Sequence, residues 1–182
     1  YTSYMDADRV EKLGLEPILP GLEKIKAAQS RADLIALTAA PGFLGRGIFG
    51  AGIKPDAKDP TKYAIYMGSG GLGLPDKDYY LKPSFAEVRT KYETYLTTLM
   101  GLIKWPDPAA TAKEIIAFET RLAEASWDRV ELRDRDNTYH RMTPAELIAY
   151  APGFDFDRMF KSAGLPESGQ VIVTDNTAFP RK

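Results

Sequence analysis

The chain contains no cysteine and only one histidine. Without cysteine, disulfide bridges and thiolate metal sites are excluded, although the redox compartment stays open because a bacterial extracytoplasmic protein can also manage without bridges. His140 stands alone, whereas zinc sites built from protein ligands usually draw on several His or Cys residues. We therefore interpret His140 as an exposed or hydrogen-bonded loop residue and expect no metal site in this chain.

The sequence also lacks an excess of charge of either sign. Lys and Arg total 24 against 25 Asp and Glu, so the formal net charge of -1 gives no attraction to nucleic acid or anionic lipid. No apolar run approaches the roughly 20 residues needed to cross a bilayer, and the first residues have no basic region followed by an apolar one. We expect no nucleic-acid partner and no membrane contact from this segment.

The 182 residues, 44% of them hydrophobic, are enough to build one good core. Tyr1 stands inside a helical pattern and Lys182 follows closely after an apparent strand, whereas natural domains usually begin and end in exposed polar linkers. We therefore expect residues 1–182 to be a single partial domain of a longer protein.

The first part of the chain predicts short helices followed by a β-hairpin. An amphipathic pattern covers residues 3–13 and ends at a glycine, and a second helix is expected after Pro20. Ser30 is placed to cap a third helix over about 31–39. β-Branched and aromatic residues then flank a run of turn formers, which predicts a β-hairpin at about 47–67.

Two long helices are predicted at about 84–104 and 107–126. Ser84 is expected to cap the first and Asp107 the second. Because the link between them is short, the helices should pack as an antiparallel hairpin. Spacings of three and four predict their buried stripes, which are Phe85, Val88, Tyr92, Tyr95, Leu96, Leu99 and Ile103 in the first helix and Ile115, Ile116, Phe118 and Leu122 in the second.

The last part of the chain predicts two short helices and a strand. Thr143 begins a capping box, a further helix is expected over 154–160, and residues 170–173 form a pattern typical of a lone strand. The fold class that follows is mainly α, a multi-helix lobe with an antiparallel helical hairpin and one small β-hairpin.

The run Gly68–Gly73 has the spacing G-x-G-x-x-G of dinucleotide-binding folds. In such a fingerprint a helix begins within the glycine run, and its N-terminus holds the phosphate. Here a turn around Pro75 follows the run, and the next helix is expected to begin only at Ser84. We interpret the run as a glycine-permitted turn. A nucleotide enzyme remains an option that calorimetry with NAD or ATP would test, and we expect no binding.

Other polar and aromatic residues favour structural roles. Glu114, Glu119 and Glu124 are spaced around one helix and are expected to be solvated, while Trp105 and Trp127 are expected to pack in the core rather than form one binding platform. No EF-hand pattern surrounds the acidic residues, which we interpret as turn formers or salt-bridge partners. They form three close pairs, Asp56/Asp59, Asp76/Asp78 and Asp134/Asp136.

The segment from Gly70 to Leu81 closely resembles a segment of the neprilysin and endothelin-converting-enzyme family of zinc metallopeptidases. Residues 1–6 and 53–59 are similar to the family's short helix and its hairpin. The series at 133–147 resembles the family's Arg-Asp, Thr-Tyr-Asn and Met-Thr steps, with His140 where Asn is usual. The motif residues that match are Gly71, Leu72, Gly73, Leu74, Pro75, Asp76, Asp78, Tyr79 and Tyr80.

The motif also has a physical explanation of its own. Its glycines permit a bend before Pro75 fixes the backbone, and Asp76 and Asp78 can bond to nearby amides or bases while the tyrosine pair packs behind them. We expect Gly73 to adopt a positive φ, in which case Gly73→Val lowers the melting temperature.

The resemblance implies a large, two-lobed, mostly helical enzyme that encloses a cavity, admits only short peptides, and cleaves them with zinc held by H-E-x-x-H and a later Glu. In the family those residues follow the part that matches Lys182, so no catalytic, cofactor-binding or zinc-binding residue carries over to this chain. The chain would be the non-catalytic, substrate-enclosing N-terminal part of a bacterial-type member, periplasmic or secreted. Its partners would be short peptides and the C-terminal catalytic portion of the same polypeptide.

A stand-alone helical module that binds a protein or ligand without catalysis is the main alternative. Coding sequence beyond Lys182 separates the two, because H-E-x-x-H with a further Glu motif supports the enzyme and a stop codon supports the module.

Overall fold

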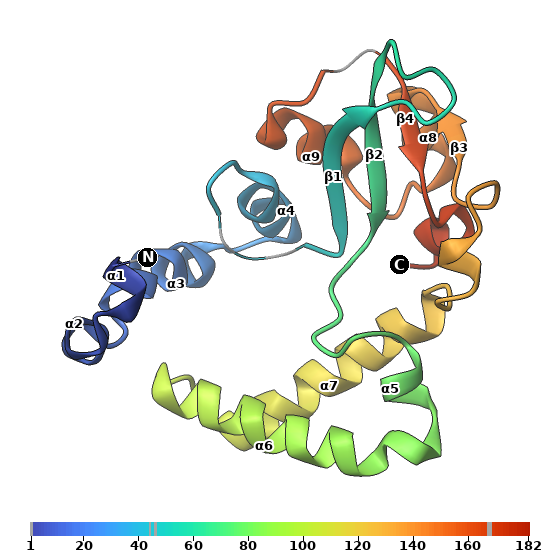
Figure 1. Ribbon diagram of the computed structural model, residues 1–182. Coiled ribbons are helices and arrows are strands. Elements are labelled where there is room, and N and C mark those ends of the chain that lie inside the picture. The colour runs from blue at the N-terminus through green and yellow to red at the C-terminus, as the bar shows by residue number, and fades with distance from the viewer. Residues whose placement is uncertain (1, 44, 46, 167–168) are drawn as a thin grey trace.

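The computed structural model describes residues 2–43, 45, 47–166 and 169–182. Tyr1, with which the family-like first segment begins, lies outside the described residues. Helices dominate the fold and a small sheet lies to one side, which confirms the mainly α class (Figure 1).

The N-terminal region is a chain of short helices that extends away from the sheet (Figure 1). The Asp6 side chain accepts the N–H of Arg9 and divides the expected first helix in two, and Gly14 ends the second part with φ +50°. In the described N-terminal segment, no residue of 7–13 or 16–27 is buried. The extending elements are α1 (Thr2–Met5), α2 (Ala7–Leu13), the 3-10 helix η1 (Glu16–Ile18) and α3 (Leu19–Ala27). The next helix, α4 (Arg31–Ala39), returns to the sheet region, where its Ile35 is part of the hydrophobic core.

The predicted β-hairpin is part of a larger sheet. Its strands β1 (Phe49–Pro55) and β2 (Tyr63–Ser69) pair antiparallel. The expected lone strand, β4 (Val171–Val173), pairs in parallel with β2, so that prediction is wrong. A further strand, β3 (His140–Met142), lies where the sequence suggested a loop and pairs antiparallel with β4. The order across the sheet is β1-β2-β4-β3.

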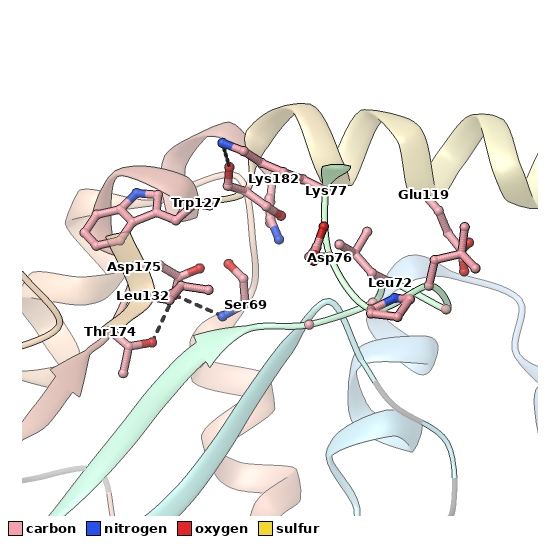
Figure 2. A pocket seen from close by; sticks show the side chains of 16 residues that line it. Ser69, Leu72, Asp76, Lys77, Glu119, Trp127, Leu132, Thr174, Asp175 and Lys182 are labelled. Carbon is pink, nitrogen blue, oxygen red and sulfur yellow. Dashed lines mark hydrogen bonds between the residues drawn. The ribbon is translucent and has the colours of Figure 1, made fainter. Parts of the chain in front are cut away.

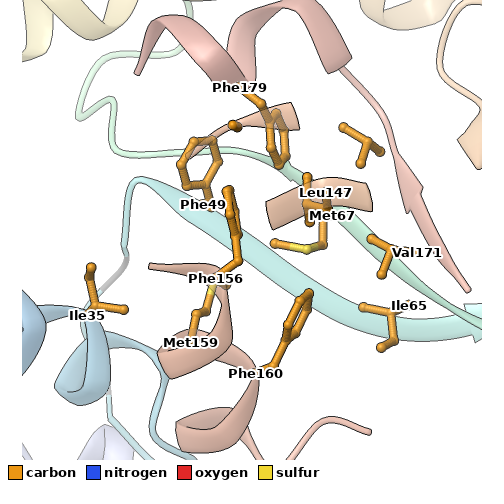
Figure 3. Close-up of a cluster of buried hydrophobic side chains, with 12 residues drawn as sticks. Ile35, Phe49, Ile65, Met67, Leu147, Phe156, Met159, Phe160, Val171 and Phe179 are labelled. Carbon is orange, nitrogen blue, oxygen red and sulfur yellow. The ribbon is translucent and has the colours of Figure 1, made fainter. Parts of the chain in front are cut away.

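The hydrophobic core lies against one face of this sheet (Figure 3). Helices α8 (Pro144–Tyr150) and α9 (Phe156–Ala163) supply Leu147 and Phe156, which are fully buried. Phe49 packs its ring 4.4 Å from that of Phe179 and 5.2 Å from that of Phe156. Burial of several aromatic rings makes this cluster the main source of hydrophobic stabilisation in the described chain.

The long helices form the predicted antiparallel hairpin (Figure 1). They are α6 (Ala86–Leu102) and α7 (Pro108–Ala125), and α6 is preceded by α5 (Asp78–Leu81) and the 3-10 helix η2 (Pro83–Phe85). Asp107 caps α7 as predicted, its side chain accepting the N–H of Ala110 at 3.2 Å. Ser84 does not cap α6, because it lies inside η2 and α6 begins two residues later.

The buried stripes of the hairpin are narrower than the sequence suggests. Of the residues expected to be buried in α6, only Leu96 is, and Tyr95 is 57% exposed. In α7, Leu122 is buried but Phe118 is 42% exposed. Periodicity identified the helices correctly, yet each apolar stripe is wider than the surface its partner covers.

The remaining elements connect these parts. Thr143 and Glu146 form the predicted capping box at the start of α8, with the Glu146 carboxylate accepting the Thr143 N–H at 2.7 Å. Gly164 ends α9 in the left-handed region at φ +66°. Two 3-10 helices complete the chain, η3 (Glu131–Arg133) after α7 and η4 (Asn176–Arg181) after β4.

Candidate functional site

The family-like motif forms the connection from β2 to α5, where it runs across α7. The N–H of Gly70 donates to the Ile48 carbonyl at 2.7 Å, which continues the hairpin ladder by one bond. Gly71 has φ +85°, and a Cβ there would lie 2.9 Å from a methyl carbon of Leu122. A side chain at Gly71 would therefore be both strained and crowded.

Gly73 is required for a different reason from the one expected. Its φ is not in the left-handed region, so the prediction of a positive φ is wrong. A Cβ added at Gly73 would instead lie 1.9 Å from the Tyr92 hydroxyl oxygen and 3.0 Å from a Glu119 carboxylate oxygen. The backbone approaches these two side chains so closely that an added side chain would force Tyr92 or Glu119 to move.

Glu119, which the Gly73 backbone approaches, is buried, so the prediction that it is solvated is wrong. The side chain is buried in α7 and accepts hydrogen bonds from the Tyr80 hydroxyl at 2.8 Å and the Tyr92 hydroxyl at 3.2 Å. The Tyr80 hydroxyl in turn accepts the backbone N–H of Leu74 at 2.8 Å. One carboxylate thus joins α5, α6, α7 and the motif turn, and we call Tyr80, Tyr92 and Glu119 the carboxylate cluster.

Burial perturbs the protonation equilibria of the carboxylate cluster. Loss of solvent raises the pKa of Glu119, and this effect outweighs the hydrogen bonds from Tyr80, Tyr92 and the Gly73 backbone, which lower it. Burial together with the neighbouring carboxylate raises the pKa of both tyrosines well above the usual phenol value. The hydroxyls therefore stay protonated near neutral pH and act as donors to the carboxylate.

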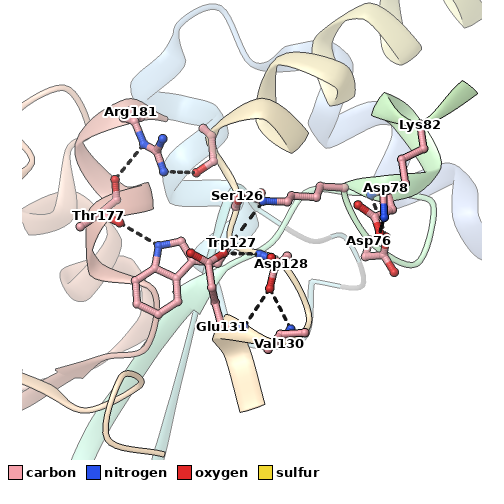
Figure 4. A network of polar contacts seen from close by, with 12 residues as sticks. Asp76, Asp78, Lys82, Ser126, Trp127, Asp128, Val130, Glu131, Thr177 and Arg181 are labelled. Carbon is pink, nitrogen blue, oxygen red and sulfur yellow. Dashed lines mark hydrogen bonds and ion pairs between the residues drawn. The ribbon is translucent and has the colours of Figure 1, made fainter. Parts of the chain in front are cut away.

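The aspartates of the motif are held by local bonds and by bases. The Asp76 carboxylate accepts the N–H of Asp78 at 2.8 Å, and Asp78 pairs with Lys82 at 2.6 Å (Figure 4). Asp76 also pairs with Arg129 at 2.5 Å. Tyr79 stacks on Phe85 with ring centroids 4.2 Å apart. Asp76 and Asp78 thus act as turn formers and salt-bridge partners, as predicted.

The other acidic pairs have similar roles. The Asp56 carboxylate accepts the Lys58 N–H and the Tyr139 hydroxyl, and Asp59 pairs with Lys62 at 2.8 Å, which with a bond from Thr61 lowers the pKa of Asp59 to about 2. Asp134 accepts the N–H groups of the following turn, including that of Asp136 at 3.0 Å.

The C-terminal end of α7 is held by cations. Lys77 donates to the Ser126 carbonyl at 3.3 Å and Arg181 donates to the Ala125 carbonyl at 3.1 Å (Figure 4). Positive charge is favourable at this end of a helix, where carbonyl groups have no partner within the helix. Through these contacts the motif turn and η4 are both tied to α7.

The two tryptophans differ in their surroundings. Trp127 is buried, donates from its indole N–H to Thr177 at 2.8 Å, and meets the His140 ring edge-on at 6.2 Å. Trp105 is only partly buried, and its ring lies 5.8 Å from the ammonium nitrogen of Lys26 in α3. Core packing is therefore confirmed for Trp127 alone.

A cavity of about 520 Å³ lies between the motif turn, the C-terminal end of α7 and the residues that flank η4, Thr174, Asp175 and Lys182 (Figure 2). Leu72, Leu74 and Pro75 line it on the motif side. On the sheet side, the buried Asp175 carboxylate accepts the Ser69 N–H at 3.1 Å. Burial lowers the pKa of Lys182, which also lines the cavity, to about 8.

The motif residues thus lie together, and their contacts connect the end of β2 to α5, α6 and α7. The described residues contain no group of three or more His, Cys, Asp or Glu placed to hold a metal ion. His140 lies in β3, where its Nδ1 is 3.1 Å from the Val173 carbonyl oxygen. The first helix after the glycine run is α5, which begins at Asp78, so no helix N-terminus lies at the run to hold a phosphate group.

Sequence reasoning missed Glu119, Arg129 and the strand containing His140. A signal for Glu119 was present, because it lies seven residues after the buried Ala112 and three before Leu122, on the same face of α7. Arg129 follows the helix in a turn, and no local pattern links it to Asp76.

Comparisons with known proteins give the family of the chain. A family model described as Peptidase family M13 matches residues 1–181. Endothelin-converting enzyme 1 of Cavia porcellus and that of Homo sapiens are each 28% identical to it over 191 residues, which cover 96% of this chain and 25% of the relative. The chain therefore spans about a quarter of the length of these relatives.

Comparison with solved structures points to the same family. Zinc metalloprotease Zmp1 of Mycobacterium tuberculosis in complex with an inhibitor superposes with a TM-score of 0.87 and 31% identity, over 98% of this chain and 28% of the Zmp1 chain. Zmp1 in its open state gives a TM-score of 0.86 over the same shares. This chain therefore belongs to peptidase family M13, and it is the N-terminal region of a neprilysin-like metallopeptidase.

Proposed function

We propose that the polypeptide containing this chain is a zinc metalloendopeptidase that hydrolyses short peptides, and that residues 1–182 form a non-catalytic partial domain that helps to wall its substrate chamber. The observation that carries the proposal is the match of 98% of the chain to a zinc metalloprotease at a TM-score of 0.87. Zinc and the residues that bind it would come from the C-terminal catalytic portion.

The arrangement of the helices supports a role in enclosing space. The N-terminal helices and the α6–α7 hairpin extend from the sheet region toward the same side of the molecule (Figure 1). The two extensions approach each other where Lys26 lies over the Trp105 ring. Such a cation–π contact contributes about 0.5–1 kcal/mol at an exposed site, enough to favour the arrangement but not to fix it.

Exposed apolar side chains on these extensions support a further partner. Tyr4 is 84% exposed and Val10 53% in the N-terminal helices, and Tyr95 and Leu102 are each 57% exposed on α6. Surfaces of this kind mark contacts with other protein when they are contiguous. The C-terminal catalytic portion of the same polypeptide is the partner we propose for them.

The family motif would then hold the hairpin at a fixed angle to the sheet. The carboxylate cluster fastens the turn to α7, and Arg129 fastens Asp76 to the segment that follows α7. A chamber wall needs this rigidity, because a substrate held between two lobes is positioned only as well as the lobes are.

Hydrolysis of a fluorogenic peptide panel tests the proposal. The full polypeptide should cleave short peptides, and a chelator should abolish cleavage. A version that ends at Lys182 should be inactive with or without added zinc. Chelator-sensitive turnover by residues 1–182 alone, or an inactive full polypeptide without H-E-x-x-H, would contradict the proposal.

We also propose an extracytoplasmic location, periplasmic or secreted, in a bacterium. No helix in the described part of the chain is long and apolar enough to cross a membrane. Cell fractionation with an antibody to the chain tests the location, and recovery in the cytoplasmic fraction would contradict it.

A further inference from the structure

Strand β1 is the outer strand of the sheet, and no described strand pairs with its other side. An edge strand presents backbone N–H and C=O groups that can pair with another extended chain. The chemistry offered by this edge is that of main-chain hydrogen bonding.

The register identifies which groups face outward. The Asp56 N–H donates to the Lys62 carbonyl and the Gly70 N–H to the Ile48 carbonyl, so 48/70 and 56/62 are hydrogen-bonded pairs. In an antiparallel ladder such pairs alternate with pairs whose backbone groups point away from each other. Residues 50, 52 and 54 therefore bond to β2, and Ala51 and Ile53 direct their N–H and C=O groups to the open side.

The middle of this edge is unprotected. Ala51 is exposed and Ile53 is 58% exposed, although Ile53 lies on the sheet face that buries its neighbour Ile65. A Cβ added at Gly50 or at Gly52 would have no other atom within 4 Å, so the space beside these two residues is open. Lysine and proline commonly block strand edges, but here Lys54 and Pro55 stand only at the end of β1.

A groove of about 570 Å³ runs beside β1 and gives an added chain a place to lie. Helices α4 and α9 also line it, contributing Thr38 and Met159 among others, and the groove continues over residues 66–70 at the end of β2. Lys54 is the one charged side chain among the described residues that line it, so the groove disfavours cationic ligands.

We propose that the free edge of β1 binds an extended, uncharged or acidic peptide as an additional strand, where the groove lined by β1, α4 and α9 is open. The inference rests on the proposed function, since peptides are then the ligands of the protein. Binding through backbone groups would accept many sequences, and side chains of the peptide would contact Ile53 on one face and the space above Gly50 and Gly52 on the other. The site would hold only a short stretch, because Pro55 offers no N–H.

Hydrogen exchange in the full polypeptide tests the site directly. The probe is an N-acetylated peptide amide of alternating valine and threonine with one glutamate, added with a chelator so that no hydrolysis occurs. The Ala51 and Ile53 amides should exchange at least about tenfold more slowly with the peptide bound. A matched peptide with lysine in place of glutamate should bind more weakly.

A proline variant removes one outward donor without breaking the β1–β2 ladder. Ala51→Pro should weaken probe binding about tenfold, whereas Ala51→Val, which keeps the N–H, should bind like the wild type. Ile53→Pro provides a second variant with the same expectation. Circular dichroism checks that each variant stays folded.

Several results would overturn the inference. Equal binding by Ala51→Pro, Ile53→Pro and Ala51→Val would show that β1 does not pair with the peptide. Slow exchange at Ala51 and Ile53 before any peptide is added would show that another segment of the polypeptide already covers the edge. Protection by the probe in a polypeptide that cleaves no peptide would leave this site standing while the proposed peptidase function fails.

Discussion

The sheet region and the helical hairpin are held together by different kinds of contact. On the sheet, short elements bury whole aromatic and branched side chains such as Phe156 and Val171, whose exposure is 0%. In the hairpin, α6 buries only Leu96, and α7 buries Leu122 and three alanines. The buried Glu119 carboxylate adds hydrogen bonds from Tyr80 and Tyr92 to this limited apolar packing. Long periodic helices are therefore the easier elements to predict, but the short elements form the better core.

The largest effect is expected from the sheet core. Phe156→Ala should lower the free energy of unfolding by about 3–5 kcal/mol, because it leaves a cavity among rings that cannot collapse into it. Urea denaturation measures the change. Phe118→Ala, at a residue 42% exposed in α7, is the matched control and should cost less than about 1 kcal/mol. Equal losses would remove the contrast between the two regions.

A smaller effect is expected where the motif meets the hairpin. Gly73→Ala should cost about 1–3 kcal/mol, because the new Cβ would overlap the Tyr92 hydroxyl. In a Tyr92→Phe background the penalty should shrink, and a double-mutant cycle measures the coupling. Gly101→Ala, where no other atom lies within 4 Å of the added Cβ, should be neutral or stabilising. The same penalty in both backgrounds would rule out the overlap as its cause.

The carboxylate cluster predicts a pH dependence. Burial raises the pKa of Glu119 above 4.5, so the folded state binds this proton more tightly than the unfolded state does. Stability should therefore fall as pH rises from 4.5 through the folded-state pKa, by at most about 1.4 kcal/mol per pH unit. Denaturation of the wild type and Glu119→Gln across this range isolates the effect. A wild type that gains stability relative to Glu119→Gln on raising the pH would contradict it.

The smallest changes in stability are expected at the two residues predicted to cap helices, Thr143 and Ser84. Thr143→Ala should cost about 1 kcal/mol, since its hydroxyl accepts the Glu146 N–H at the start of α8. Ser84→Ala should change stability by less than about 0.5 kcal/mol, because Ser84 lies within η2 and caps nothing. Thermal melts of the two variants side by side test this, and a larger loss for Ser84→Ala would restore the original interpretation of the cap.

Much of the site could be located from sequence, but its chemistry could not. The nine motif residues could be picked out because they lie close together along the chain, and in the structure they form a turn and the start of α5. The residue that holds them, Glu119, lies 39 positions from Tyr80, and charge alone suggested a solvated carboxylate. Its place on the buried face of α7 was the available signal, and the usual preference of glutamate for water concealed it.

The sequence by itself determined the helices, the β-hairpin, the caps at Asp107 and Thr143 and the likeness to peptidase family M13, because each depends on residues close together along the chain. Tertiary structure decided that β4 joins β2, that Gly73 must lack a side chain, and that β1 is left at the edge. These depend on contacts such as that of Ser69 with Asp175, 106 positions away, and no local propensity specifies which distant groups will meet.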